Sequence, residues 1–199
     1  MGPLFAAPFF NGEFTVTDLM NNVVAVIKET AEEIILPRFK ALTAKQIKEK
    51  SGPGDLVTIA DIEAEEKLSK ALKQLVVGSE VVGEEITSKK PDTMNLLSSE
   101  PLVWVIDPID GTKNFTKGNH LFCVMVCLVR FGTPVLATIF DPLNDRYIAA
   151  EKGSGSWLHK TTNSSAEKLK VAEAVKLDQM SGFLSLGGFR DRPTRDEMR

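Results

Sequence analysis

The sequence predicts an α+β protein in which N-terminal helices pack on an antiparallel sheet. Two segments, residues 16–39 and 61–75, carry apolar residues at helical spacing. After residue 102 the chain consists of short segments rich in β-branched and aromatic residues, separated by turn signals. A hydrophobic fraction of 43% in 199 residues is enough to build a core and excludes a disordered chain.

The first helix is expected from Val16 to Phe39 and the second from Asp61 to Leu75. Pro37 should end or kink the last turn of the first helix, and Thr58 with Asp61 fits a capping pattern at the start of the second. The predicted apolar stripes are Met20, Val23, Ile27, Ala31 and Ile34, and then Ala64, Leu68, Ala71, Leu72 and Leu75. Residues 45–54, which are charged and then glycine-rich, predict a mobile surface loop.

The strand-like segments follow in order along the chain. An apolar stretch from residue 76 ends on Glu84 and Glu85, residues 87–101 are expected to form a loop, and residues 102–106 form a buried strand. Residues 121–129, 134–142, 145–151 and 156–158 predict an antiparallel meander. Residues 168–178 are interpreted as a linker, followed by GFLSLGGF as the beginning of a further strand.

The net charge and the length of the apolar runs exclude some classes of binding partner. Lys+Arg 24 against Asp+Glu 27 gives a net charge of −3, so no basic field attracts a nucleic acid or an anionic membrane. The longest apolar run, residues 121–129, is far shorter than the ~20 residues of a membrane-spanning helix. We therefore expect a soluble protein with a small-molecule partner, no nucleic acid and no membrane.

The two cysteines and two histidines indicate the compartment and exclude one kind of site. Cys123 and Cys127 should point to the same side of a strand, buried and unpaired, which suits a reducing cytoplasm. His120 and His159 are isolated, so a zinc site of thiolates or imidazoles is not expected. The N-terminus lacks the basic region that begins a secretory signal.

Three carboxylates follow strand-like segments. Asp107 and Asp110 come directly after a buried strand, and by themselves they would be explained by a strand end and a turn. Glu84 ends another apolar segment. It favours a functional site over the explanation by a strand end and a turn, because three acids at strand ends can converge at one edge of a sheet. Carboxylates together with a backbone carbonyl such as that of Ile109 are the ligands that Mg²⁺ prefers.

Gly111 and Thr112 add a place for an anion beside these acids. Glycine permits a close backbone approach, and free amides at a helix start bind phosphate. The Thr112 hydroxyl can orient and deprotonate a water if an aspartate accepts the proton, and Asp55 is the candidate acceptor. Asp61 is interpreted as a helix-capping group.

These motifs resemble a known family. DLVTIAD (55–61), GEE (83–85), WVIDPIDGTKNF (104–115) and ATIFDPLNDRYIAAEKGSGSWL are similar to the inositol monophosphatase family of Mg²⁺-dependent, lithium-sensitive phosphatases. The resemblance implies a layered αβαβα sugar-phosphatase-like fold, two or three Mg²⁺ ions and a homodimer. It also implies that Glu85 is a group next to the metal ligands and is not itself a sure ligand.

The resemblance assigns a role to each candidate residue. Glu84, Asp107 and the Ile109 carbonyl would bind one metal, and Asp107 with Asp110 a second. Ile109, Asp110, Gly111 and Thr112 would contact the substrate phosphate, while Asp55 and Thr112 would activate the attacking water.

One feature of the family is missing. A later Trp-Asp motif supplies a further ligand in the family, but Trp104 precedes Val and Trp157 precedes Leu. We therefore expect a flexible N-terminus at 1–14, a metal- and phosphate-binding domain at 15–165, and at 166–199 the start of a truncated α/β domain. On this interpretation the 199 residues alone are an incomplete phosphatase.

The substrate expected by family default is inositol monophosphate. Lys113 leaves room for a bisphosphate nucleotidase, although Asn114 follows it as in inositol phosphatases, and a histidinol-phosphate or sugar-phosphate substrate is a further alternative. An alternative of a different class is an inactive regulatory or interaction module. The retained Asp55, Glu84, Asp107, Asp110 and Thr112 argue against it, because clustered acids are costly to a purely structural protein.

Overall fold

A computed structural model describes residues 16–50, 52, 54–161 and 166–182 of the chain. The chain divides into two units, Met1–Leu169 and Lys170–Arg199, and the first contains all the helices and strands discussed below except one short turn. None of the described helices is long and apolar enough to cross a membrane. The predicted flexible segment 1–14 lies outside the described residues.

A seven-stranded sheet forms the centre of the first unit, in the order β3-β4-β5-β6-β7-β8-β9. β3 runs parallel to β4, and every other neighbouring pair is antiparallel, as the predicted meander requires. The bounds are Glu80–Gly83, Leu102–Asp110, Cys123–Arg130, Thr133–Asp141, Arg146–Glu151, Gly155–Lys160 and Ala166–Lys168. Because β9 belongs to this sheet, the sheet continues past the predicted boundary at residue 165.

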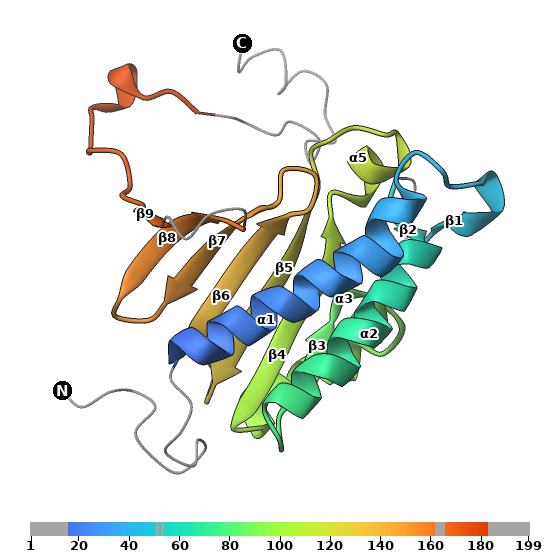
Figure 1. Cartoon of the computed structure of the whole chain (residues 1–199), viewed down its shortest axis with the longest axis horizontal. Coiled ribbons are helices and arrows are strands. Elements are labelled where there is room, and N and C mark those ends of the chain that lie inside the picture. Colours follow the sequence, from blue (N-terminus) through green and yellow to red (C-terminus); the bar gives the residue numbers. More distant parts are fainter. Residues whose placement is uncertain (1–15, 51, 53, 162–165, 183–199) are drawn as a thin grey trace. The chain divides into compact units, whose positions relative to one another are not determined.

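Two helices, α1 (Val16–Thr30) and α2 (Ile59–Leu75), lie side by side on one face of the sheet (Figure 1). The predicted α+β class is confirmed. The core between the layers is apolar because each helix has one apolar stripe and alternate strand residues face it. It includes Leu19, Val23, Ile27, Ala64, Leu68, Leu72, Trp104, Val124, Val126, Leu128, Leu136 and Phe140, all at most 2% exposed.

The first helix ends earlier than its apolar pattern predicts. After Thr30 the chain forms a π-helical turn, Ala31–Ile35, and then a 3₁₀ turn, Leu36–Arg38, that contains Pro37. The wider π turn brings Ile35 into the core, whereas Ile34 packs at its edge. Pro37 lies in the last helical turn, which ends at Arg38, as expected of a residue that lacks an N–H donor.

Two segments predicted as loops contain secondary structure. β1 (Ile47–Glu49) pairs antiparallel with β2 (Leu56–Thr58), so the prediction of an unstructured loop at 45–54 is wrong for its central residues. The segment 87–101 contains the end of α3 (Glu84–Lys89), a 3₁₀ turn (Pro91–Asn95) and α4 (Leu96–Ser99). These short elements lack the repeated apolar stripe by which longer helices are recognised.

Two further predictions concern the cysteines and the C-terminal segment. Cys123 and Cys127 are both free and share one face of β5, but each is half-buried rather than fully buried because the helices cover the opposite face. In the second unit the described residues contain one 3₁₀ turn, Leu177–Gln179. The predicted strand GFLSLGGF lies, apart from Gly182, outside the described residues.

Candidate active site

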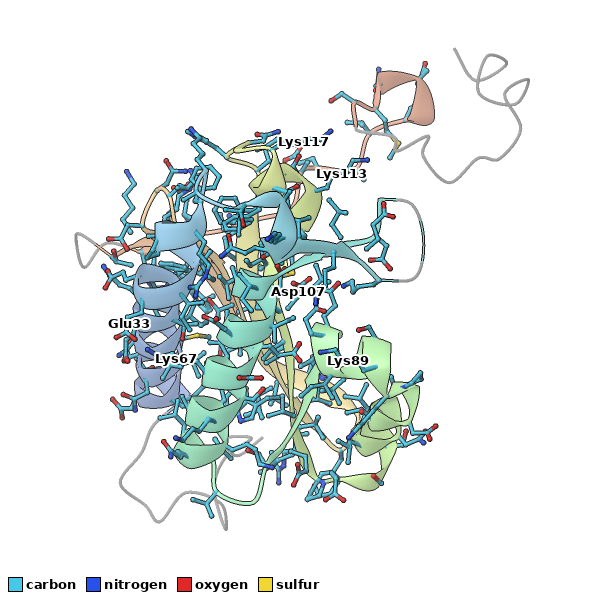
Figure 2. The ribbon with its side chains drawn as sticks, turned by 90° about the vertical axis from the view of Figure 1, so that its right-hand side faces the viewer. Glu33, Lys67, Lys89, Asp107, Lys113 and Lys117 are labelled. Atoms are coloured by element: carbon cyan, nitrogen blue, oxygen red, sulfur yellow. The ribbon has the colours of Figure 1, made fainter. Side chains whose placement is uncertain are left out.

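A cavity of about 450 Å³ opens where β3 and β4 end, and it contains three of the predicted acids. Since these two strands are parallel, their carboxyl ends meet at the same edge of the sheet. Figure 2 shows Asp107 in this region, beneath α5 (Thr112–Thr116), with Lys113 in that helix and Lys117 directly after it. The lining consists of Lys50, Asp55, Val82, Gly83, Glu84, Thr87, Ser88, Met94, Val105, Ile106 and Asp107.

The end of β4 is shaped by a bulge and by a glycine. Asp107 pairs with Met125 and Asp110 with Cys123, so β4 has one residue more than β5 across this step. The bulge turns Asp110 to the exposed side, where its carboxylate accepts a weak bond of 3.8 Å from the Cys123 thiol. Gly111 has φ of 91°, and a Cβ there would lie 2.7 Å from the Leu121 carbonyl oxygen, so the turn into α5 requires glycine.

Lys50 lies among the acids of the cavity. Its ammonium is 2.6 Å from Glu84 Oε1, 3.0 Å from Glu85 Oε1 and 3.8 Å from Asp55 Oδ1. Burial alone would lower the pKa of Lys50, but hydrogen bonds to Glu84 and Glu85 and their negative charges raise it above its usual value. The side chain is 11% exposed, so a fixed positive charge offsets the negative charge of the cavity.

Asp107 has a strongly altered acidity. Burial raises its pKa to about 8, and the charge of Glu84, a hydrogen bond with Glu84 and the charge of Asp110 act in the same direction. The backbone N–H of Ile109, 3.1 Å from Asp107 Oδ1, partly opposes the shift. The negative charges of Glu84 and Asp110 thus act on Asp107. The single positive charge of Lys50 does not compensate the charge of all three acids.

The hydroxyl of Thr112 contacts an aspartate, and that aspartate is Asp61. Thr112 Oγ1 lies 3.2 Å from Asp61 Oδ1 and 3.0 Å from the Ile109 carbonyl oxygen, so it can donate its proton to either. Asp61 is fully buried and also accepts a bond of 2.8 Å from the Thr58 backbone N–H. Burial raises its pKa, while the hydrogen bonds from Thr58 and Thr112 lower it.

Asp61 Oδ1 lies within hydrogen-bond distance of Thr112 Oγ1, so Asp61 is a candidate proton acceptor beside Asp55, the partner of Thr112 that the sequence predicts. Asp55 lies in the cavity with Glu84 and Asp107 at the end of the β1–β2 hairpin, near Lys50. The capping role predicted for Asp61 is confirmed, but a capping carboxylate has a second oxygen, and here that oxygen faces Thr112. This free oxygen is the signal by which Asp61 could have been found.

The donor set suits a hard divalent cation. Glu85 is 2% exposed, and its Oε2 has no hydrogen-bond partner within the part of the chain that the structure describes. A buried carboxylate oxygen without a partner, beside an aspartic acid whose pKa is about 8, marks a deficit of positive charge. In donor type the residues fit Mg²⁺. Among the described residues, however, no three acidic, histidine or cysteine side chains surround a common point in this structure, so binding an ion requires these side chains to move.

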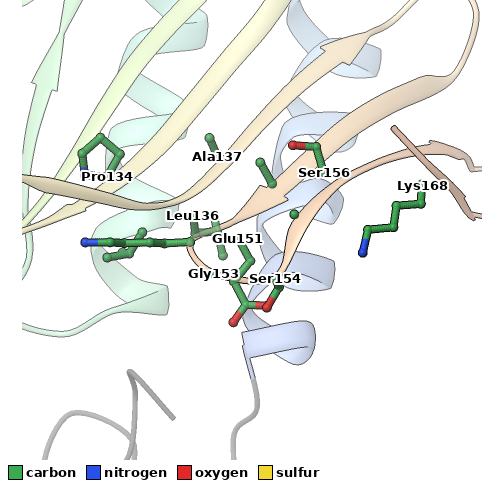
Figure 3. Close-up of a pocket in the computed structure, with 12 residues that line it drawn as sticks. Pro134, Leu136, Ala137, Glu151, Gly153, Ser154, Ser156 and Lys168 are labelled. Carbon is green, nitrogen blue, oxygen red and sulfur yellow. The ribbon is translucent and has the colours of Figure 1, made fainter. Parts of the chain in front are cut away.

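A second hollow, of about 610 Å³, lies beside the hairpin turns of β6, β7 and β8 (Figure 3). Its charged lining residues are Glu151, Lys152 and Lys168, of which both lysines are exposed. It is larger than the acidic cavity but carries a single carboxylate. The hollow therefore offers no set of oxygen ligands.

The chain is similar to proteins of one family along most of its length. The family model described as the inositol monophosphatase family matches residues 16–198. An inositol monophosphatase of Dictyostelium discoideum is 34% identical over 165 residues, which cover 83% of this chain and 56% of that protein. The Nus factor SuhB of Xylella fastidiosa is 30% identical over 171 residues, covering 86% and 56% respectively.

Solved structures share the fold. An IMPase from Thermotoga maritima matches with a TM-score of 0.64 at 24% identity and covers 78% of this chain and 54% of that one. A staphylococcal IMPase complexed with products matches with a TM-score of 0.60 at 22% identity and covers 73% and 51%. The chain spans about half the length of the curated relatives it matches.

Proposed function

The chain belongs to the inositol monophosphatase family, and on that premise we propose that its protein hydrolyses a phosphate monoester with the help of Mg²⁺. One observation carries the proposal. Glu84 and Asp107 face each other in the cavity at the ends of β3 and β4, and there the pKa of Asp107 is raised to about 8. Carboxylates that are held close together despite their mutual repulsion, with a raised pKa, are typical of a functional site.

We propose that Glu84, Asp107, Asp110 and the Ile109 carbonyl hold two or three Mg²⁺ ions. Mg²⁺ supplies positive charge to the phosphate oxygens and increases the acidity of water. Lys50 already brings one positive charge to Glu84 and Glu85, and its contacts keep these side chains turned toward the cavity. A carbonyl oxygen has two lone pairs, so the Thr112 contact leaves Ile109 able to accept a second partner.

We propose that Thr112 and Asp61 move the proton of the attacking water. Thr112 Oγ1 can accept a hydrogen bond from the water while it passes its own proton toward Asp61 Oδ1, 3.2 Å away. The buried Asp61 is fixed by Thr58, so its oxygen does not have to be oriented during the reaction. Asp55, the acceptor predicted from the sequence, remains the alternative to be tested beside Asp61.

The substrate phosphate is proposed to contact Ile109, Asp110, Gly111 and Thr112. The left-handed turn at Gly111, where a side chain would meet the Leu121 carbonyl, leads directly into α5. The unpaired amides at the start of a helix favour an anion. Asp110 would face the phosphate through a shared cation, because two negative groups repel each other.

We propose inositol monophosphate as the substrate. The relatives extend beyond one activity: a protein of Aquifex aeolicus, 30% identical over 164 residues, is named fructose-1,6-bisphosphatase/inositol-1-monophosphatase. A bisphosphate nucleotide, histidinol phosphate and a sugar phosphate therefore belong in the same test. Lithium sensitivity, a homodimer and a cytoplasmic location are proposed by family likeness; one solved structure of a staphylococcal inositol monophosphatase is a LiCl-soaked inhibitory complex.

The test is phosphate release by the intact protein from inositol 1-phosphate, adenosine 3′,5′-bisphosphate, fructose 1,6-bisphosphate and histidinol phosphate. We expect Mg²⁺-dependent release that is fastest with inositol 1-phosphate and is abolished by Asp107→Asn. Metal-independent release, or equal rates with Asp107→Asn, would contradict the proposal. Absence of release with all four substrates would favour the inactive interaction module.

A further inference from the structure

Glu65 is a buried acid on α2 that the proposed chemistry does not use. It is 1% exposed and lies one helical turn after Asp61, on the side of α2 that faces the end of β3. A carboxylate is rarely buried unless its oxygens are satisfied by strong hydrogen bonds. The hydrogen-bond partners of Glu65 therefore indicate its role.

Both carboxylate oxygens of Glu65 accept backbone hydrogen bonds from α3. Oε2 accepts from the Glu85 N–H at 2.7 Å, and Oε1 accepts from the Ile86 N–H at 2.8 Å. These amides belong to the first turn of α3, where helix N–H groups lack partners within the helix. The preceding residue is Gly83, which has no side chain to cap them, so the capping oxygen comes from another helix.

The absence of a side chain at Gly83 is matched to Glu65. A Cβ at this position would lie 2.5 Å from Glu65 Oε2 and 2.8 Å from Oε1, closer than real contacts allow. The φ of Gly83 is −106°, a value that other residues adopt freely. The glycine is therefore required by the close approach of the Glu65 carboxylate and not by the backbone conformation.

The backbone that carries the GEE motif is consequently held in place by Glu65. Glu84 lies beside the amides that Glu65 binds, and its side chain reaches Lys50 and Asp107 in the cavity. A metal ligand whose main chain is held in place loses little freedom when it binds an ion. Loss of the Glu65 bonds would let the first turn of α3 rotate and move Glu84 away from Asp107.

We propose that Glu65 is a positioning residue for the metal site: its carboxylate fixes the start of α3 and so aims Glu84 at Asp107. The role deepens the proposed function and rests on it for the identity of the ion. Glu65 does not touch the reacting atoms. Its substitution should weaken metal binding more than it weakens the fold.

The test compares Glu65→Gln with Glu66→Gln, a matched change at the neighbouring exposed position. Glutamine keeps one acceptor but turns an NH₂ donor toward one of the two amides. We expect Glu65→Gln to retain a cooperative melting transition, to raise the Kd for Mg²⁺ measured by calorimetry by about 10- to 100-fold, and to speed amide hydrogen exchange at Glu85 or Ile86 at least about tenfold. Glu66→Gln should leave both quantities unchanged.

The outcomes separate this inference from the proposed function. If the wild-type chain binds no Mg²⁺, the proposed function fails, and the exchange rates of Glu85 and Ile86 still decide the role of Glu65. If Glu65→Gln does not fold, Glu65→Asp replaces it, because it keeps the charge but withdraws both oxygens by one methylene. A folded variant at Glu65 with wild-type Mg²⁺ affinity, or with wild-type exchange at both amides, overturns the inference.

Discussion

The cavity at the ends of β3 and β4 and the larger hollow beside β6, β7 and β8 differ in how their side chains are held. In the cavity Lys50 is 11% exposed and ion-paired, and Asp107 is held by Glu84 and the Ile109 amide. In the hollow Lys152, Gly153, Ser154 and Lys168 are all exposed. The smaller space is thus the more constrained one.

The difference teaches that constraint of the side chains, rather than volume, distinguishes the proposed site from the larger hollow. A bulge in β4, a glycine that no other residue can replace without strain, and buried capping acids on α2 all act on the cavity. Near the hollow the glycines of the β7–β8 turn serve only to reverse the chain. Substitutions in the two regions should therefore have very different effects.

The largest effect is expected at the Thr112–Asp61 pair. Asp61→Asn removes the proton acceptor, so kcat should fall by about 100-fold or more while KM changes little. Asp55→Asn, at a residue that lines the cavity, is the matched comparison and should have a much smaller effect on kcat. Steady-state kinetics decide between them: a larger loss of kcat with Asp55→Asn would favour the pairing predicted from the sequence.

A smaller but clear difference is expected between two glycines. Gly111→Ala combines a positive φ with a contact of 2.7 Å to the Leu121 carbonyl, and should lower the free energy of unfolding by about 2–4 kcal/mol. Gly153→Ala, in the hollow, has φ of +86° but no atom within 4 Å of the new Cβ, and should cost about 1 kcal/mol. Urea unfolding measures both, and equal costs would show that strain alone governs these turns.

The pH dependence of stability should also differ between metal-free and Mg²⁺-bound protein. Because the pKa of Asp107 is about 8 in the folded chain and 3.8 as a reference, the folded state binds more protons between these values. Without metal the free energy of unfolding should therefore fall as pH rises from about 4 to 8 and level off above. Urea unfolding midpoints, measured at several pH values in the presence of a chelator, test this pH dependence. Asp107→Asn should reduce it. An unchanged pH dependence in that variant would show that the other buried acids cause it.

The smallest effect is expected in the hollow. Lys168→Gln and Glu151→Gln alter exposed or half-exposed groups, and each should change the free energy of unfolding by less than about 0.5 kcal/mol. Neither should change phosphate release. A change in kcat caused by either substitution would show that the hollow is energetically coupled to the cavity.

The sequence predicted the parts of the fold that depend on periodicity. The two helices and the order of the strands followed from repeated apolar spacing and turn signals, and the structure confirms them. The π turn at Ala31–Ile35, β1 and α4 are too short to give a period. They are stabilised by tertiary neighbours, which no local pattern reveals.

Prediction of the site could use side chains that follow strand ends, but it had no signal for partners that come from elsewhere in the chain. Glu84, Asp107 and Asp55 do share one cavity. The contact between Thr112 and Asp61 joins residues 51 positions apart, and the bonds from Glu65 to α3 join residues about 20 apart. Asp61 and Glu65 both have the pattern of ordinary helix residues, so their roles depend on contacts with α5 and α3.

The central claim is that the acids at the ends of β3 and β4 bind a divalent cation, and calorimetric titration of the chain with Mg²⁺ tests it most directly. We expect saturable binding at pH 8.5 that weakens as the pH falls, by up to about tenfold per unit below 8, because the ion must displace the proton of Asp107. Asp107→Asn should reduce the affinity at least about tenfold at pH 8.5, whereas Lys168→Gln should not. Binding that is independent of pH and unchanged by Asp107→Asn would contradict the account.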